Sequence, residues 1–318
     1  MGKIAFIFPG QGAQYIGMGK ELYENIEECR DIFNIADKEL NFELSKLCFE
    51  GPQAELDITE NTQPAILTTS IAALMALKKH GIKCDVTAGL SLGEYSALVC
   101  SGVMDFKDAV KLVKKRGKFM QEAVPVGIGT MAAIIGLEAD LVEEACSEVR
   151  NSGIVEIANL NCPGQIVIAG EIATVELACA KATQKGAKRA ILLPVSAPFH
   201  TSMLKPAALK LEIELENIDL KDITIPVMTN VNGDYIKSKN NIKGNLKLQV
   251  MSSVLWETII RNMIKDGVDT FVEIGPGKVL CGFVKKIDRK LTAVNVEDMA
   301  SLDKAVASLN KAIELIKR

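Results

Sequence analysis

The chain has 318 residues, enough for one large domain or two smaller ones, and its 48% apolar and 24% charged residues are typical of a soluble protein with a full core. A formal net charge of −3 gives no reason to expect nucleic acid or an anionic membrane surface as a partner. None of the eight cysteines forms a CxxC pair, so we expect no metal centre of the zinc-ribbon kind and no thioredoxin-like motif.

The apolar run over residues 3–8 is too short for a signal peptide and is followed by Pro9. No other apolar run reaches the length of a membrane span. We therefore expect no membrane attachment and a cytoplasmic location.

Strand-like and helix-like segments alternate along the chain, which favours an α/β fold with a mostly parallel sheet. In the first part we predict strands over 3–8 and 84–88 and helices over 21–40, 65–80, 94–100 and 105–123. Pro64 is expected in the first turn of the second of these helices, and Gly81 follows its end.

Between residues 125 and 194 the pattern of predicted strands and helices changes. We predict strands over 130–135, 154–159, 165–169 and 189–193, with helices over 139–150 and 171–184. This β-α-β-β-α-β order is that of a ferredoxin-like unit. The prediction is a ferredoxin-like α+β subdomain at 125–194, inserted into a major domain formed by 1–124 and 195–318.

The major domain then continues. We predict helices over 204–217, 250–265 and 302–316 and another from 278, with strands over 225–229, 270–274 and 291–296. The polar segment 237–247 is predicted to be a surface loop.

The segment 89–93 reads GLSLG, a GxSxG pattern with a predicted strand before it and a predicted helix after it. Strand, tight glycine turn and helix form the context of a nucleophile elbow, in which a serine hydroxyl is lifted into the open. The backbone N–H groups that start the following helix then face any oxyanion formed at the serine. Ser91 is therefore the candidate nucleophile.

A serine nucleophile needs a base, most often histidine, and the chain has only two. His80 ends a predicted helix beside Gly81, where a cationic side chain favours the helix dipole and no further role is needed. His200 lies in a loop after a predicted strand, where catalytic groups tend to sit, although a loop histidine without a role is also consistent. A serine–histidine pair must therefore join Ser91 to His200.

Two glycine turns could be taken for phosphate-binding loops, but neither matches the sequence motif of such a loop. The first, over 10–14, has Tyr15 where a dinucleotide fingerprint needs glycine, and it lacks the GK[ST] ending of a P-loop. The second, over 275–278, is followed by Val279. The first turn is better read as a source of oxyanion donors, with the N–H of Gln11 beside that of Leu92, or as a plain tight turn.

Six segments occur in a fixed order along the chain: PGQGAQ at 9–14, GLSLGEY at 89–95, RGKFMQ at 116–121, NCPGQ at 161–165, FH at 199–200 and GPGK at 275–278. In this order and spacing the chain resembles bacterial malonyl-CoA:acyl carrier protein transacylases over nearly its whole length. The resemblance implies an α/β-hydrolase-like major domain with a ferredoxin-like insert. It also implies transfer of malonyl from malonyl-CoA to the phosphopantetheine thiol of acyl carrier protein in fatty acid biosynthesis, through a malonyl-serine intermediate.

The resemblance implies roles for individual residues. Ser91 would be malonylated, and His200 would act as general base and then as acid toward the leaving thiol. Gln11 and Leu92 would supply the oxyanion hole, and the backbone carbonyl of Gln249 would orient the histidine. Arg116 would hold the malonyl carboxylate, Asn161 would lie at the edge of the site, and Phe199 would fit members that take malonyl. Without the resemblance, Arg116 reads as part of a solvated helix face at 114–118.

The chain departs from the family at two positions. Leu90 stands where the family commonly has histidine, so the shape and polarity beside the acyl group can differ. Ser253 stands where proline is frequent, which changes the stiffness of that loop.

The expected partners are malonyl-CoA and holo acyl carrier protein, with no cofactor and with the enzyme as a monomer. Because carrier proteins are acidic, we expect a basic docking face. Its candidates are Lys188 and Arg189 on the insert and Lys285, Lys286 and Arg289 on the last part of the chain.

Three rival functions remain open at this point. A serine thioesterase or esterase would orient His200 with an acid such as Glu156 or Glu171. A discrete polyketide acyltransferase would share the chemistry and use another carrier. An inactive interaction module would have the same fold but no catalytic activity.

Overall fold

The computed structural model describes residues 2–195 and 197–317, with side chains through residue 310. Two separate four-stranded sheets organise the chain. One is parallel, with the strand order β2-β1-β7-β8, and the other is antiparallel, with the order β4-β5-β3-β6. The predicted fold class, a parallel α/β unit with a small α+β subdomain, is confirmed.

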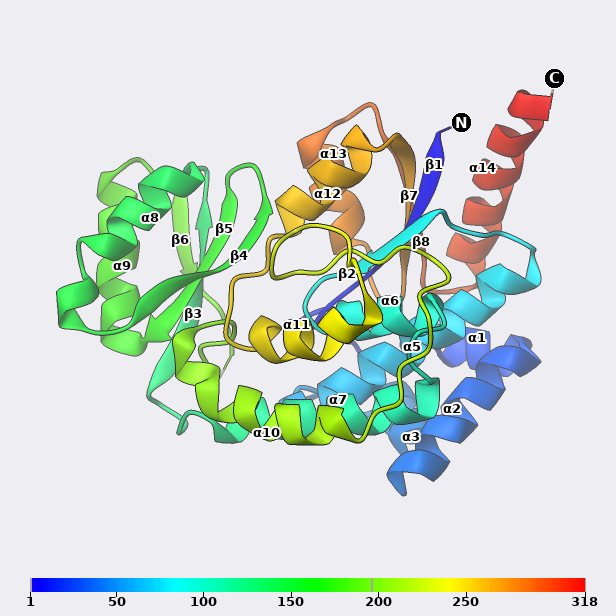
Figure 1. Ribbon diagram of the computed structural model, residues 1–318, viewed down its shortest axis with the longest axis horizontal. Coiled ribbons are helices and arrows are strands. Elements are labelled where there is room, and N and C mark those ends of the chain that lie inside the picture. Colours follow the sequence, from blue (N-terminus) through cyan, green and yellow to red (C-terminus); the bar gives the residue numbers. More distant parts are fainter. Residues whose placement is uncertain (1, 196, 318) are drawn as a thin grey trace.

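The parallel sheet is built from β1 (Lys3–Phe8), β2 (Val86–Gly89), β7 (Val268–Ile274) and β8 (Thr292–Val296). The helices of the same part are α1 (Lys20–Asn25), α2 (Glu27–Leu40), α3 (Leu44–Glu50), α4 (Gln53–Leu56), α5 (Thr59–Lys79), α6 (Gly93–Cys100), α7 (Phe106–Glu122), α10 (Lys205–Glu216), α11 (Ile242–Gln249), α12 (Trp256–Lys265), α13 (Val279–Ile287) and α14 (Met299–Lys317). They lie on both sides of the sheet (Figure 1), and β1 is buried along all but its first residue.

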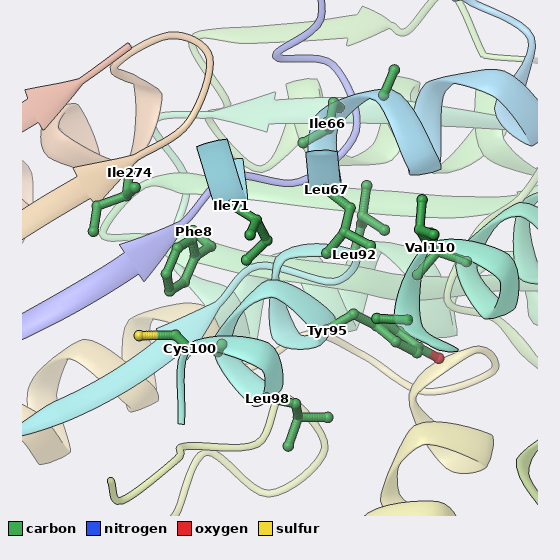
Figure 2. Close-up of a cluster of buried hydrophobic side chains, with 14 of the residues drawn as sticks. Phe8, Ile66, Leu67, Ile71, Leu92, Tyr95, Leu98, Cys100, Val110 and Ile274 are labelled. Atoms are coloured by element: carbon green, nitrogen blue, oxygen red, sulfur yellow. The ribbon is translucent and has the colours of Figure 1, made fainter. Parts of the chain in front are cut away.

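Apolar side chains of α5, α6 and α7 pack against one side of the parallel sheet. Figure 2 shows Phe8 and Ile274 from two strands meeting Ile71 from α5 and Leu92 from the start of α6. Since both faces of this sheet are covered, most positions of β1, β2 and β7 are buried, as expected for parallel strands.

The antiparallel sheet stands apart from the parallel one, at the left of Figure 1. It contains β3 (Gly129–Ile135), β4 (Val155–Cys162), β5 (Gln165–Glu171) and β6 (Arg189–Leu192), and its helices are α8 (Ala139–Ser147) and α9 (Ile172–Gln184). The β-α-β-β-α-β order is confirmed, and both flanking strands pair antiparallel to the central β3 and β5. The edge strand β4 also reaches the other part, through backbone hydrogen bonds that link Val254 with Ala158 and Leu160.

Several predicted boundaries were wrong. The helix predicted at 21–40 is two helices, because Ile26 takes an extended conformation (φ −127°, ψ 118°) between them. Helix α5 begins at Thr59, so Pro64 lies inside the helix and not in its first turn. The predicted strand at 225–229 forms only single bridges, from Val227 to Thr87 and from Met228 to Tyr235.

The largest error concerns the segment 237–265. The predicted surface loop holds helix α11, whose buried residues Ile242, Leu246 and Gln249 follow helical spacing. The helix predicted at 250–265 begins only at Trp256. In the described residues no helix has both the length and the apolar character that a membrane span requires.

Candidate active site

The turn from β2 into α6 places Ser91 at the carboxyl edge of the parallel sheet. Ser91 has a positive φ of 52°, a conformation that a non-glycine residue adopts at some cost. A Cβ on Gly89 would lie 1.8 Å from the carbonyl carbon of Gly93, and a Cβ on Gly93 would lie 2.2 Å from the oxygen of Phe8. Only glycine fits these two positions, so the GxSxG spacing is what lets strand and helix approach this closely.

Ser91 and His200 meet as the sequence predicts. The serine Oγ lies 2.7 Å from His200 Nε2, and His200 Nδ1 lies 2.7 Å from the backbone oxygen of Gln249. A carbonyl oxygen only accepts hydrogen bonds, so Nδ1 carries the proton and Nε2 is free to accept from the serine hydroxyl. His200 also has a positive φ, 62°. His80, by contrast, is exposed at the C-cap of α5, as predicted.

Among the described residues, no carboxylate contacts the His200 ring, as a serine hydrolase would require. Glu156, on β4, accepts hydrogen bonds from the backbone N–H and hydroxyl of Ser202, at 2.9 and 2.5 Å. It therefore anchors the loop that follows His200 to the antiparallel sheet. The histidine itself is oriented by the backbone carbonyl of Gln249.

Arg116 is buried, with 1% of its surface exposed, so its interpretation as part of a solvated helix face was wrong. The reason is its place on α7, three residues after buried Val113 and four before buried Met120. Its guanidinium donates to Gln63 Oε1 at 2.9 Å, to Gln249 Oε1 at 3.0 Å and to Ser91 Oγ at 3.2 Å. A buried cation thus points directly at the candidate nucleophile.

Sequence reasoning missed three polar residues that support this centre: Gln63, Glu94 and Asn230, all buried. Asn230 accepts from the Ser91 N–H at 2.6 Å and donates to the Gly89 oxygen at 2.7 Å. Glu94 Oε2 accepts from Gln249 Nε2 at 2.6 Å and from the Asn230 N–H at 3.0 Å. A sequence signal existed for Glu94, since it is the one charged residue of an otherwise apolar helix.

Burial and the charge of Arg116 lower the pKa of His200 to about 4, although hydrogen bonds at the backbone of Gln249 and Ser252 oppose the shift. Burial raises the pKa of Glu94 to about 6, against the opposing effects of its hydrogen bonds and of Arg116. At neutral pH the centre therefore holds a neutral imidazole, an ionised carboxylate and a guanidinium.

The remaining predicted residues are Gln11, Leu92, Phe199, Asn161 and Leu90. In the described part of the chain, the backbone N–H groups of Gln11 and Leu92 donate to no protein acceptor. Gln11 is held by its side chain, which donates to Thr59 Oγ1 at 3.2 Å. Phe199 and Asn161 are both 7% exposed, and no described residue partners the Oδ1 of Asn161. Leu90 is partly buried, and a Cβ on Gly10 would meet its backbone oxygen.

The glycine turn at 275–278 offers no anion site. The carboxylate of Glu273 already accepts from the N–H groups of Leu280 and Cys281, at 3.1 and 2.7 Å, in the first turn of α13. The candidate docking cations Lys188, Arg189, Lys285, Lys286 and Arg289 are all exposed. Lys286 donates to Gln165 Oε1 at 2.8 Å and so joins α13 to β5.

Comparison with known proteins identifies the family. The model of the acyl transferase domain matches residues 5–310. The malonyl CoA-acyl carrier protein transacylase of Bacillus subtilis is 52% identical over 312 residues, which cover 98% of each chain. The crystal structure of malonyl CoA-acyl carrier protein transacylase from Clostridium perfringens superposes with a TM-score of 0.97 at 51% identity, covering 99% of this chain and 100% of that one.

A third relative was solved with its partner. It is a malonyl-transacylase in complex with a type II PKS acyl-carrier protein, 43% identical, with a TM-score of 0.94 and coverage of 96% of this chain and 99% of that one. With a matching family model, relatives of this identity over nearly full length, and the fold of the solved structures, the chain belongs to the malonyl CoA-acyl carrier protein transacylase family.

Proposed function

We propose that this protein transfers malonyl from malonyl-CoA to the thiol of acyl carrier protein, as a malonyltransferase of fatty acid biosynthesis, through an ester on Ser91. The observation that carries the proposal is a buried guanidinium 3.2 Å from the nucleophile of a serine–histidine pair. A thioester with a plain acyl chain has no use for that cation. A malonyl group does, because arginine binds a carboxylate bidentately and keeps its charge.

In the first half-reaction, Ser91 Oγ attacks the thioester carbonyl carbon while His200 Nε2 takes the serine proton. The N–H groups of Gln11 and Leu92 receive the oxyanion, which carries the negative charge of the tetrahedral intermediate. The carbon–sulfur bond then breaks, and His200 returns the proton to the coenzyme A thiolate. The products are malonyl-Ser91 and free coenzyme A.

In the second half-reaction the carrier thiol takes the place of coenzyme A. His200 accepts the thiol proton, the sulfur attacks the ester carbonyl, and the Ser91 oxygen leaves with the proton from His200. Malonyl-carrier departs and the free serine is restored. Each half-reaction therefore exchanges one thiol for one hydroxyl, with no net proton change.

The charge of the acyl group assists the base. Arg116 is one of the two causes that lower the pKa of His200. A malonyl carboxylate bound to Arg116 offsets that positive charge, so the imidazolium forms more readily once malonyl is in place. An acetyl group brings no such charge, and acylation by acetyl-CoA is slower for this reason as well as for weaker binding.

The contacts of His200 favour a transferase over the rival serine hydrolase. A hydrolase of that kind normally orients its histidine with an acid. Here His200 Nδ1 faces a backbone carbonyl instead, and Glu156 is occupied by Ser202. We place Asn161, Phe199 and Leu90 along the acyl pocket and the exposed cations Lys188, Arg189, Lys285, Lys286 and Arg289 on the face that meets an acidic carrier. A cytoplasmic location and a monomeric state belong to the same proposal.

The test is the intact mass of the protein after mixing with malonyl-CoA alone, beside a Ser91→Ala variant. We expect one malonyl adduct on the parent, none on the variant, and loss of the adduct when holo acyl carrier protein is added. Free malonate without an adduct would indicate a hydrolase. No reaction at all would overturn the proposal.

A further inference from the structure

Glu94 is a charged side chain that the proposed reaction does not use. It is fully buried on α6, three residues after Ser91. Burying a lone carboxylate is costly unless its hydrogen bonds are satisfied. In the described residues, Glu94 Oε2 accepts hydrogen bonds from Gln249 and Asn230, and Oε1 has no partner. Both Gln249 and Asn230 also contact Ser91.

The first contact determines the orientation of an amide. An ionised carboxylate only accepts hydrogen bonds, so Gln249 must present its NH2 group to Glu94, at 2.6 Å. The same Nε2 donates to the Ser91 oxygen at 3.0 Å. The carbonyl end of the amide is thereby left facing Arg116, from which it accepts at 3.0 Å. Gln249 links a buried anion to a buried cation.

The orientation matters because arginine has no acceptor. If residue 94 were neutral, the Gln249 amide would lose its charged partner and would be held only by Arg116 and the Ser91 oxygen. Arg116 would then be held less firmly by Gln249, while its contact with Gln63 Oε1 at 2.9 Å would remain. The guanidinium would keep its charge but would be aimed less firmly at the acyl group.

The second contact reaches the nucleophile itself. The Asn230 N–H donates to Glu94. The Asn230 side chain accepts from the Ser91 N–H and donates to the Gly89 oxygen, so it holds the turn that carries the serine. The same carboxylate therefore supports the serine and the arginine at once.

We propose that Glu94 is a positioning residue, which sets the preference for a carboxylated acyl group by fixing the Gln249 amide and, through it, the orientation of Arg116. The inference rests on the proposed malonyl transfer and deepens it. It requires Glu94 to be ionised. Among the described residues, the charged or titratable groups that act on the Glu94 carboxylate are Arg116 from α7 and Tyr95, its neighbour on α6.

The requirement that Glu94 be ionised predicts a pH dependence of the acyl preference in the unmodified protein. Burial raises the pKa of Glu94 to about 6, whereas the pKa of His200 lies at about 4. As pH falls through about 6, Glu94 gains a proton while His200 is still neutral. Acylation by malonyl-CoA should fall in that range and acylation by acetyl-CoA should fall less, so the ratio of the two kcat/KM values narrows from pH 7.5 to pH 5.

The variant is Glu94→Gln, which keeps the size of the side chain and removes its charge. We expect the malonyl-to-acetyl ratio to drop by about 10-fold, since hydrogen bonds to charged groups are the stronger ones. We also expect the ratio to lose its change near pH 6. A residue that only held the fold would lower both rates together and leave that pH dependence in place.

The matched control is Glu273→Gln, at a second fully buried carboxylate, whose partners Leu280 and Cys281 lie in α13. It should retain the parent ratio and pH dependence, whatever it does to the melting temperature. The Glu94 proposal is overturned if the parent ratio is constant from pH 7.5 to 5, or if Glu94→Gln keeps the parent ratio. A parent that forms no malonyl-Ser91 would instead overturn the proposed function, and this inference with it.

Discussion

The two sheets of this protein use burial in different ways. The insert packs α8 and α9 on one face of an antiparallel sheet, and in the described residues the core between them buries no charged side chain. Its ion pairs, such as Arg150 with Glu143 and Lys185 with Glu148, stay at the surface. The parallel sheet is covered on both faces and buries Glu94, Arg116 and His200 beside its carboxyl edge. In such dry surroundings charges interact more strongly than they do at the surface.

The two halves differ in what they provide to the proposed active site. The parallel half contains the proposed nucleophile, the proposed base and the buried cation. The insert contacts the loop of His200 from outside, through Glu156, and we propose that Asn161 near the end of β4 lies at the edge of the site. Changes in the two halves should therefore have different consequences.

The largest effect is expected from the base. His200→Ala should slow acylation of Ser91 by about 10,000-fold, because the other described side chain that contacts Ser91 Oγ is Arg116, which cannot take a proton. Stopped-flow or quenched mass measurements with malonyl-CoA check this. His80→Ala is the control, at the exposed end of α5, and should acylate like the parent. Equal activity of the two variants would contradict the pairing of Ser91 with His200.

The next effect is on stability, and it compares one glycine from each half. Gly89→Ala should lower the free energy of unfolding by about 3 kcal/mol or more, since its Cβ would lie 1.8 Å from the Gly93 backbone. Gly186→Ala in the insert meets no atom within 4 Å and has only a positive φ of 103° to accommodate. It should cost about 1 kcal/mol. Urea unfolding measures both, and a similar loss in the two variants would contradict the tight elbow.

The smallest effect is expected on the exterior of the insert. Reversing charge at Lys188 and Arg189 should raise the KM for carrier by about fivefold, since exposed charges contribute little each. Acylation by malonyl-CoA should not change, and the difference in KM should shrink at high salt. An unchanged carrier KM would remove these two residues from the docking face.

The local patterns of the chain predict much of this architecture. The GxSxG turn, its flanking strand and helix, and the β-α-β-β-α-β order of the insert all follow from the sequence. The pairing of Ser91 with His200 follows because the chain has only one other histidine. The turn and the element order depend on residues that are neighbours in the chain. The pairing of the serine with the histidine depends on the number of histidines. The sequence alone gives both kinds of information.

The supporting network depends on contacts between distant segments. Glu94 and Gln249 are 155 residues apart, and Asn230 and Ser91 are 139 apart. A hint was present for Arg116, which continues the buried stripe of α7, but the lysines on either side of it concealed that stripe. Helix α11 was missed for a similar reason, because Lys243, Asn245 and Lys247 are interspersed among its buried residues and one of those, Gln249, is itself polar.

We propose that the parallel half builds a serine nucleophile and a carboxylate-selecting cation into one buried centre. The most direct test is the rate of acyl-enzyme formation with malonyl-CoA and with acetyl-CoA, on the parent and on Arg116→Ala. We expect the variant to lose about 100-fold in rate with malonyl-CoA and far less with acetyl-CoA. An equal loss with both substrates, or none with malonyl-CoA, would contradict it.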